Sequence, residues 1–442
     1  MKIPERIIQI GLIFLILLSL YFTYVIWLSP ANKGTPELNN STNAVVSPTA
    51  NYRKETETFL PLRITWFQGD EIKESNGENL ITNIQKEVNN ASIGKVEKKV
   101  SENKEGFAPY DVVKNGIELG YASSFLLSEY NETYGLSIDL SEANEGNFYF
   151  NTIQIDYDKK KIRFLDYSNY SIYEAAIDID ETKINDFLTS KNTSLTPMKN
   201  AEESILERQY STQDKVKLKK YSYILAQQPV SLFRNAFFQN PENVQENNSA
   251  LSFYSGREVL SISETSQAID FKGDIAPNMK QTDIFAESFS YIKKLGNSIG
   301  NLRYFDHSAN TVNYRTFVEG FPVFSDGNQG KVSIDIQQNR KNQVVGGPDY
   351  SIHIETSRNT IQVPIPSDEE VELLSTNEMV QQLVDKGASV DKVKNVMIGY
   401  TWKVIKDTKT VVDLTPEWYV QYEDTWYSAN DLLQNLSELE GK

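Results

Sequence analysis

The sequence contains no cysteine and only two histidines, His307 and His353, in 442 residues. The missing thiols exclude disulfide bonds, thiol catalysis, cysteine-based zinc sites and a lipid-modified N-terminal cysteine. Neither histidine has the spacing of a zinc-binding helix, so we expect no metal site and no cofactor. For a chain that works outside a membrane, this composition suits a bacterial envelope that does not depend on disulfides.

Basic residues are also fewer than acidic ones: the sequence has 44 lysines and arginines and 60 aspartates and glutamates, which gives a net charge of -16. Such a charge repels nucleic acid and anionic lipid headgroups, so we predict no nucleic-acid partner. The rest of the composition is ordinary for a globular protein, and the length predicts about two to four domains.

Motifs that carry chemistry are largely absent, including glycine-rich phosphate loops and calcium loops. Gly296-Asn297-Ser298-Ile299-Gly300 has the spacing of a nucleophile elbow. That motif needs a strand before it and a helix after it, and here the predicted order is reversed. Ser290 and Lys293 have the spacing found in penicillin-recognising enzymes, without the Lys-Ser/Thr-Gly triplet that accompanies it. We therefore predict that the protein is not an enzyme, and we keep an envelope serine hydrolase as an alternative.

What the sequence does contain is one long uncharged run, IIQIGLIFLILLSLYFTYVIWL, at residues 7–28. As a helix it would measure roughly 33 Å, enough to cross a hydrocarbon core of about 30 Å. Although Ser29 and Ala31 form a weak cleavage site, the run is too long for a signal peptide. Lys2 and Arg6 precede it and place the N-terminus in the cytoplasm. We therefore predict a single-pass protein of the cell membrane whose bulk is extracytoplasmic.

Gly11, Leu15, Ser19 and Thr23 recur every four residues in this run and so share one face of the predicted helix. Small and hydroxylated residues let helices approach closely in lipid and form hydrogen bonds across the contact. We predict that this face binds a partner's transmembrane helix. The alternative is chance, because any run of this length contains a few small residues.

Beyond the run, the patterns predict an α+β fold in several domains. The last two segments each contain a helix followed by an antiparallel meander, which predicts two similar helix-plus-sheet modules. The predicted division is a cytoplasmic tail at 1–6, a transmembrane helix at 7–28, a flexible stalk at 29–58, an N-terminal α+β domain at 59–200, a central α+β domain at 201–364 and a C-terminal α+β module at 365–442.

Local patterns add four predictions. Residues 148–157 and 161–167 read as a hairpin, and Ser375 with Glu378 reads as a capping box that opens a helix. The run 363–366, Val-Pro-Ile-Pro, reads as a stiff linker. The acidic run 368–370 follows Ser367 and reads as the first turn of a helix, where carboxylates favour the helix dipole.

The order and length of several runs resemble the YycH family, whose members are accessory proteins of the WalK–WalR (YycG–YycF) two-component system in low-GC Gram-positive bacteria. The runs that carry the resemblance are IIQIGLIFLILLSLYFTYVIW, QQPVSLFRNAFFQNP, NTVNYRTFVEGFPVF, IPSDEEVELL, MIGYTWKV and LTPEWYVQY. The resemblance implies a membrane-anchored regulator without catalytic residues. It further implies that the protein acts with the sister protein YycI on the essential histidine kinase WalK, which controls cell-wall metabolism, and that its C-terminal modules are PepSY-like.

The resemblance leaves the sign of regulation open, because accessory proteins of this kind restrain or support a kinase. A second alternative is an extracytoplasmic ligand sensor, in which a cleft between the modules binds a wall fragment or a peptide.

Overall fold

The computed structural model describes residues 52–99, 103–111, 113–141, 148–200, 204–206, 209–247, 251–275, 284–339, 350–365, 367–405, 408 and 410–440. The predicted cytoplasmic tail, the predicted transmembrane helix and most of the predicted stalk lie outside these residues. Within them, no helix is both long enough and apolar enough to cross a membrane.

The described helices differ in length, and most carry one apolar face. They are α2 (Glu55–Thr58), α3 (Glu78–Asn90), α4 (Lys104–Asp111), α5 (Leu127–Thr133), α6 (Glu181–Leu188), α7 (Val230–Phe237), α8 (Ile284–Leu295), α9 (Thr376–Asp385) and α10 (Ala429–Leu439), with short 3-10 turns η4 (Pro241–Asn243) and η5 (Val390–Lys392). The predicted capping box is confirmed at the start of α9, where the Ser375 side chain accepts from the Glu378 N–H and the Glu378 carboxylate accepts from the Ser375 N–H.

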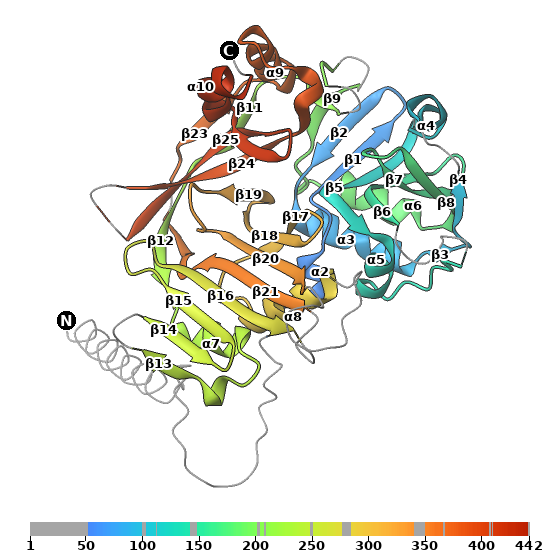
Figure 1. Ribbon diagram of the computed structural model, residues 1–442. Coiled ribbons are helices and arrows are strands. Elements are labelled where there is room, and N and C mark those ends of the chain that lie inside the picture. Colours follow the sequence, from blue (N-terminus) through green and yellow to red (C-terminus); the bar gives the residue numbers. More distant parts are fainter. Residues whose placement is uncertain are drawn as a thin grey trace, which may run out of the picture. The chain divides into compact units, whose positions relative to one another are not determined.

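The first sheet runs in the order β10-β9-β2-β1-β5-β6-β7-β8-β3, with β4 also paired to β8 (Figure 1). Its strands are β1 (Arg63–Gln68), β2 (Glu71–Ser75), β3 (Ser92–Ile93), β4 (Glu97–Lys99), β5 (Asn115–Leu126), β6 (Tyr149–Asp156), β7 (Lys161–Asp166), β8 (Ser171–Asp178), β9 (Thr196–Lys199) and β10 (Ser211–Thr212). The predicted hairpin is confirmed as β6 and β7. One face of this sheet buries alternate residues such as Ile117 and Leu119 against the apolar side of α3.

The large sheet runs in the order β13-β14-β15-β16-β21-β20-β18-β19-β24-β25-β12-β22, with β17 on β18 and β26 on β25. Its strands are β12 (Tyr221–Gln227), β13 (Gln245–Asn247), β14 (Ser252–Ser255), β15 (Glu258–Ile262), β16 (Ala268–Ile275), β17 (Leu302–His307), β18 (Thr311–Val318), β19 (Phe321–Phe324), β20 (Lys331–Gln338), β21 (Tyr350–Ser357), β22 (Asn359–Ile365), β24 (Val393–Val404), β25 (Val411–Tyr422) and β26 (Thr425–Ser428). A separate two-stranded ribbon pairs β11 (Val216–Lys219) with β23 (Glu370–Leu373). The strand β20 shows why the sheet forms, since Val332, Ile334 and Ile336 are buried and alternate with more exposed residues.

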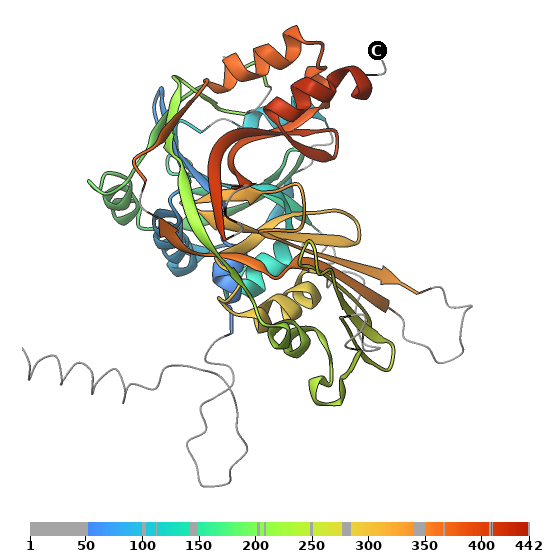
Figure 2. The same cartoon turned by 90° about the vertical axis from the view of Figure 1, so that its left-hand side faces the viewer.

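Helices cover the large sheet at two places. α8 packs on β18 and on α7, and α10 packs on β25, β26 and α9 (Figure 1, Figure 2). The predicted repeat of a helix followed by strands is present as α8 with β17, β18 and β19, and as α9 with β24, β25 and β26. That these modules are PepSY-like stays a prediction.

The structure corrects three expectations from local sequence. Described structure starts at Tyr52, before the predicted end of the stalk, and α2 follows at once. The run 363–366 is not a linker, because Val363, Pro364 and Ile365 end the strand β22, which pairs with β12. A proline fits there because β22 is the last strand of the sheet and needs no second partner. The acidic run 368–370 opens no helix, since it leads into β23, where Glu370 lies opposite Lys219.

Strand pairing also crosses both predicted domain boundaries. β10 lies beyond residue 200 and pairs with β9 of the first sheet. β12 and β25 lie on either side of residue 364 and pair with each other. One apolar core contains residues of the first sheet, such as Ile117, and of the large sheet, such as Ile334. The division into three extracytoplasmic domains therefore stays a prediction, while the sheets and the core are shared across it.

Candidate functional site

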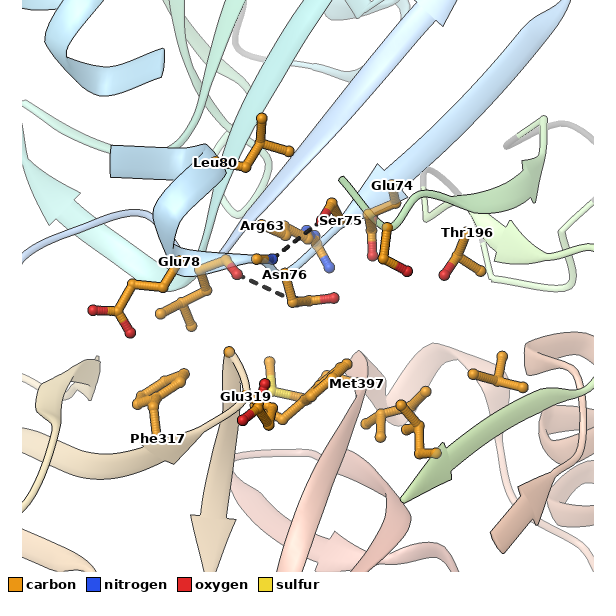
Figure 3. A pocket seen from close by; sticks show the side chains of 18 of the residues that line it. Arg63, Glu74, Ser75, Asn76, Glu78, Leu80, Thr196, Phe317, Glu319 and Met397 are labelled. Carbon is orange, nitrogen blue, oxygen red and sulfur yellow. Dashed lines mark hydrogen bonds between the residues drawn. The ribbon is translucent and has the colours of Figure 1, made fainter. Parts of the chain in front are cut away.

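A cleft of about 1020 Å³ lies between the first sheet and the strands β11, β19 and β24. Small-molecule sites commonly enclose about 300–1,000 Å³, so this cleft is large enough to hold a ligand. Figure 3 shows Arg63, Glu74, Ser75 and Asn76 on one side of it and Phe317, Glu319 and Met397 on the other. We call the two sides the polar wall (residues 63, 74–79, 83, 190, 192–194 and 196) and the aromatic wall (residues 221, 317, 321, 400 and 418).

The polar wall is built by the end of β2 and the start of α3. Gly77 is the N-cap of α3 and has no side chain with which to cap it. Instead, the Gly77 N–H donates to the Ser75 hydroxyl at 3.1 Å, and the Asn76 amide donates to the Leu62 carbonyl at 3.2 Å (Figure 3). These bonds hold the loop open toward the cleft, as turns with short polar side chains commonly do.

One cation and one carboxylate lie close together in this wall. Arg63 lies against Gly120 of β5, where a Cβ would come within 2.8 Å of the Arg63 Nε, so glycine makes room for the guanidinium. Burial raises the pKa of Glu74, while the charge of Arg63 and a hydrogen bond from Thr65 act in the opposite direction. Within the described residues, the Arg63 guanidinium makes no hydrogen bond of its own.

Glu74 belongs to a row of polar side chains that crosses the first sheet from β2 to β8. Directly paired residues in the row are Glu74 with Thr65, Thr65 with Glu118, Glu118 with Gln154, Gln154 with Arg163, and Arg163 with Glu174. Arg163 donates to Gln154 at 2.7 Å and to Glu174 at 2.8 Å. Buried networks with satisfied hydrogen bonds are rigid, so this row gives the polar wall a fixed support.

The aromatic wall presents rings to the cleft, and the polar groups of Tyr400 and Trp418 are already bonded. The Tyr400 ring contacts the Tyr221 ring at 5.7 Å and the Phe321 ring at 6.2 Å. The Tyr400 hydroxyl donates to the Lys219 carbonyl at 3.0 Å, and the Trp418 indole donates to the Leu374 carbonyl at 2.9 Å. The wall therefore offers the cleft apolar ring surface, which packs well against aliphatic groups.

The two walls touch at the turn between β18 and β19. Glu319 and Gly320 both have positive φ, at 50° and 83°. A Cβ on Gly320 would lie 1.9 Å from the Asn76 carbonyl oxygen, so only glycine permits this contact. Asn301, which precedes β17, donates to the Glu78 carboxylate at 2.6 Å and joins the same two regions.

A second feature leads from the N-terminal side of the chain to the cleft. We call residues 52–62 the clasp segment. Arg53 is 4% exposed, and its guanidinium donates to the carbonyls of Gly296 at 2.7 Å, Gly300 at 2.6 Å and Leu302 at 3.2 Å. Burial lowers the pKa of Arg53 to about 10, with Glu57 and Glu78 acting in the opposite direction.

The rest of the clasp segment is held between the first sheet and the large sheet. Phe59 is fully buried, and its ring stacks on Phe125 of β5 at 5.0 Å and lies 5.7 Å from Phe289 of α8. The Phe59 carbonyl accepts from Tyr121, and the carbonyls of Leu60 and Pro61 accept from Arg303. The segment then enters β1 at Arg63, in the polar wall.

Comparison with known proteins identifies the family. The sequence profile described as "YycH protein, C-terminal domain" matches residues 207–435, which is more than half of the chain. The chain belongs to the YycH family. A comparison with curated protein sequences found no match.

The fold agrees with this assignment. The solved structure titled "Crystal Structure of YycH from Bacillus subtilis" is similar to this chain with a TM-score of 0.66 at 14% sequence identity, and the match covers 86% of this chain and 97% of that one. The mixed α+β fold is therefore shared with a YycH structure, as the resemblance in sequence implied.

The predicted partner-binding residues, Gly11, Leu15, Ser19 and Thr23, lie outside the described residues of this YycH-family chain. The elbow-like run around Ser298 does follow a helix, because it forms the turn after α8, and Gly296 and Gly300 both have positive φ. Its two glycine carbonyls are acceptors for Arg53, which gives the run a structural role. Sequence reasoning missed Arg53 because it stands in a polar stretch that carries no periodic signal.

The two histidines lie apart from the cleft walls. His307 contacts the Tyr304 hydroxyl through Nδ1 at 2.9 Å, and burial lowers the pKa of His307. The His353 Nε2 lies 2.7 Å from the Asp270 Oδ2. Together with Glu355, these residues have possible metal-ligand atoms that lie within 4.8 Å of one another. Asp270 also pairs with Lys272 at 3.4 Å, so its charge is already balanced. Sequence analysis missed this cluster because Asp270 and His353 come from different strands.

Proposed function

We propose that this protein is a non-enzymatic regulator of the YycG/WalK histidine-kinase system that acts by binding. In this proposal residues 7–28 anchor it in the cell membrane, the bulk is extracytoplasmic, and YycI is its partner. The observation that carries the proposal is membership of the YycH family, supported by the match over residues 207–435. A regulator of this kind shifts a kinase only if it binds the two signalling states with different affinities.

The clasp segment supports a physical route for such regulation. It begins within the last residues of the predicted stalk, and it runs through the core to Arg63 in the polar wall. Its side chains and carbonyls make hydrogen bonds to the surrounding core along its length, so the segment is rigid. Ligand binding in the cleft and movement of the predicted anchor would therefore act on the same segment.

The test uses variants of the predicted transmembrane helix. One variant moves Gly11, Ser19 and Thr23 off a common face while keeping the composition of the run, and a control scrambles other positions and keeps the face. We expect the first to change kinase output in cells and the control to leave it unchanged. Equal kinase output from the variant and the control would show that the predicted face does not bind a partner helix. Crosslinking from single cysteines along residues 7–28 then identifies the neighbouring helix, since the chain has no cysteine of its own.

The cleft favours a second candidate, an extracytoplasmic ligand sensor. A volume of about 1020 Å³ with one polar and one aromatic wall fits a ligand of mixed polarity. A thermal-shift screen with wall fragments and peptides tests it, because a ligand that binds only the folded state raises the melting temperature. The envelope serine hydrolase is tested by Ser298→Ala and Ser290→Ala, which must abolish turnover of an activated ester if either serine is a nucleophile.

A further inference from the structure

An open strand edge borders the cleft. Val216, Lys217, Leu218 and Lys219 of β11 all line it, although successive side chains of a strand point to opposite faces. Four consecutive lining residues therefore mean that the backbone edge of β11 faces the cleft. β11 pairs with β23 on its other edge, and this ribbon has no third strand among the described residues.

Hydrogen bonds indicate which backbone groups are open. Lys220 N–H donates to the Glu369 carbonyl at 2.8 Å, so that pair faces β23. In an antiparallel pair, bonded and non-bonded positions alternate, so Lys217 and Lys219 direct their N–H and C=O groups away from β23. The Tyr400 hydroxyl confirms this direction, because it donates to the Lys219 carbonyl from the cleft side. The Lys217 N–H and C=O and the Lys219 N–H have no partner in the described part of the chain.

A second edge lies nearby. Val396, Met397 and Ile398 of β24 are also consecutive and all line the cleft. On this side β24 pairs with β19 only at Tyr400 and Thr401. The cleft is thus bordered by unpaired backbone from two strands, a feature that a site for rigid sugars or cofactors does not need.

We propose that the cleft binds an extended peptide that adds to the open edge of β11 as a third strand. Strand addition obtains affinity from main-chain hydrogen bonds and specificity from side chains that alternate between two sides. Here those sides are the aromatic wall and the polar wall. The inference deepens the proposed function, because it names the chemistry of what a binding regulator would hold in this cleft.

The edge sets the length and charge of the peptide. The four residues of β11 span about 13 Å, so the paired part of the peptide has about four to six residues. The lysines of β11 are matched by acids of β23, with Lys217 at 3.6 Å from Glu372 and Lys219 directly opposite Glu370. The ribbon therefore favours neither sign of charge. The peptide would carry apolar side chains at every second position, toward Tyr221 and Phe321, and amide or hydroxyl side chains between them.

The experiment begins with a phage-displayed library of linear 12-residue peptides, selected on the full chain in lipid nanodiscs. Enriched peptides are synthesised with single N-methyl groups at each position in turn, and affinity is measured by fluorescence polarisation. Strand addition predicts that N-methylation weakens the affinity at least about tenfold at every second position of the peptide, since only alternate N–H groups face β11. N-methylation at the positions between them should change the affinity little. Uniform loss, or none, would overturn the proposal.

Two variants of the protein complete the test. Lys217→Pro removes the open N–H while sparing the ladder to β23, because proline is tolerated on an edge strand when its nitrogen faces away from the partner. Lys217→Ala keeps the N–H and is the matched control. We expect at least about tenfold weaker binding for the first and less than about twofold change for the second. Equal affinities would reject strand addition, and so would a library that yields no binder.

The outcomes also separate this proposal from the proposed function. If chitin-type oligosaccharides raise the melting temperature and no peptide does, the cleft is a glycan site and the peptide proposal fails. If the peptide binds as predicted and Lys217→Pro leaves kinase output in cells unchanged, the peptide site is supported. Its proposed role in kinase regulation is then rejected. The N-methyl scan needs only the native protein, so it decides the matter even if Lys217→Pro folds poorly.

Discussion

Replacing Arg53 with alanine should destabilise the protein strongly, although Arg53 lies in a stretch that looks like a stalk. Its guanidinium makes three hydrogen bonds to backbone carbonyls. Bonds from a charged donor contribute about 1.5–3 kcal/mol each, which gives about 5–9 kcal/mol before the cost of burial. That cost appears in the lowering of the Arg53 pKa from its usual value to about 10. At about 1.4 kcal/mol per pKa unit it is about 3.5 kcal/mol, so Arg53→Ala should lower the free energy of unfolding by about 1.5–5.5 kcal/mol.

The assay is urea unfolding of the full chain in nanodiscs, followed by tryptophan fluorescence. The matched control is the neighbouring Lys54→Ala, because the Lys54 side chain is 73% exposed and its one ion pair among the described residues is with Glu57. Exposed pairs contribute less than about 1 kcal/mol, so the control should behave like the native chain. Hydrogen exchange should show faster opening of the turn at Gly296–Gly300 in Arg53→Ala alone. If the two variants unfold within about 0.5 kcal/mol of each other, the clasp segment does not hold the fold as we infer.

Three further perturbations follow from the same structure. Phe59→Ala empties a fully buried position among aromatic rings and should cost about 3–5 kcal/mol in urea unfolding. Gly320→Ala should cost clearly more than Gly135→Ala, since both have positive φ but only a Cβ at 320 meets a backbone atom, at 1.9 Å; equal midpoints in urea would count against the contact with Asn76. Burial lowers the pKa of His307, so its contribution to stability is present above about pH 6.5 and lost as the pH falls through the lowered pKa. His307→Phe should therefore reduce the fall in melting temperature between about pH 7 and pH 5, and an unchanged fall would assign acid sensitivity elsewhere.

Elements with strong local signals could be predicted from the sequence. The hairpin of β6 and β7 joins two strand-like runs through a short charged loop, Asp158-Lys159-Lys160. Ser375 and Glu378 predict the start of the helix α9, because a capping box satisfies backbone N–H groups with side chains only three residues apart. In both cases the determining contacts are local, so the sequence carries them directly.

Elements that depend on distant partners could not be predicted. β22 carries a proline and looks like a linker, and it is a strand only because β12 pairs with it. The acidic run 368–370 looked like the start of a helix, and its last residue, Glu370, is instead the first residue of β23 and lies opposite Lys219 of β11. The cleft has no sequence signature at all, since its walls come from segments as far apart as Glu74 and Trp418.

The energies above limit how this protein can transmit a signal. Releasing the clasp segment would mean losing both Arg53 and Phe59 from their sites, at a combined cost of about 5 kcal/mol or more. A ligand present at a hundred times its dissociation constant supplies only about 2.7 kcal/mol. A peptide in the cleft therefore could not pull the clasp segment out of the core. It could shift the weaker contact between the walls, at Gly320 and Asn76, and at the single bond from Asn301 to Glu78. The clasp segment, bonded to Tyr121 of the first sheet and to Arg303 of the large sheet, would then stay fixed while only the turn at Gly320 and the loop at Asn76 move.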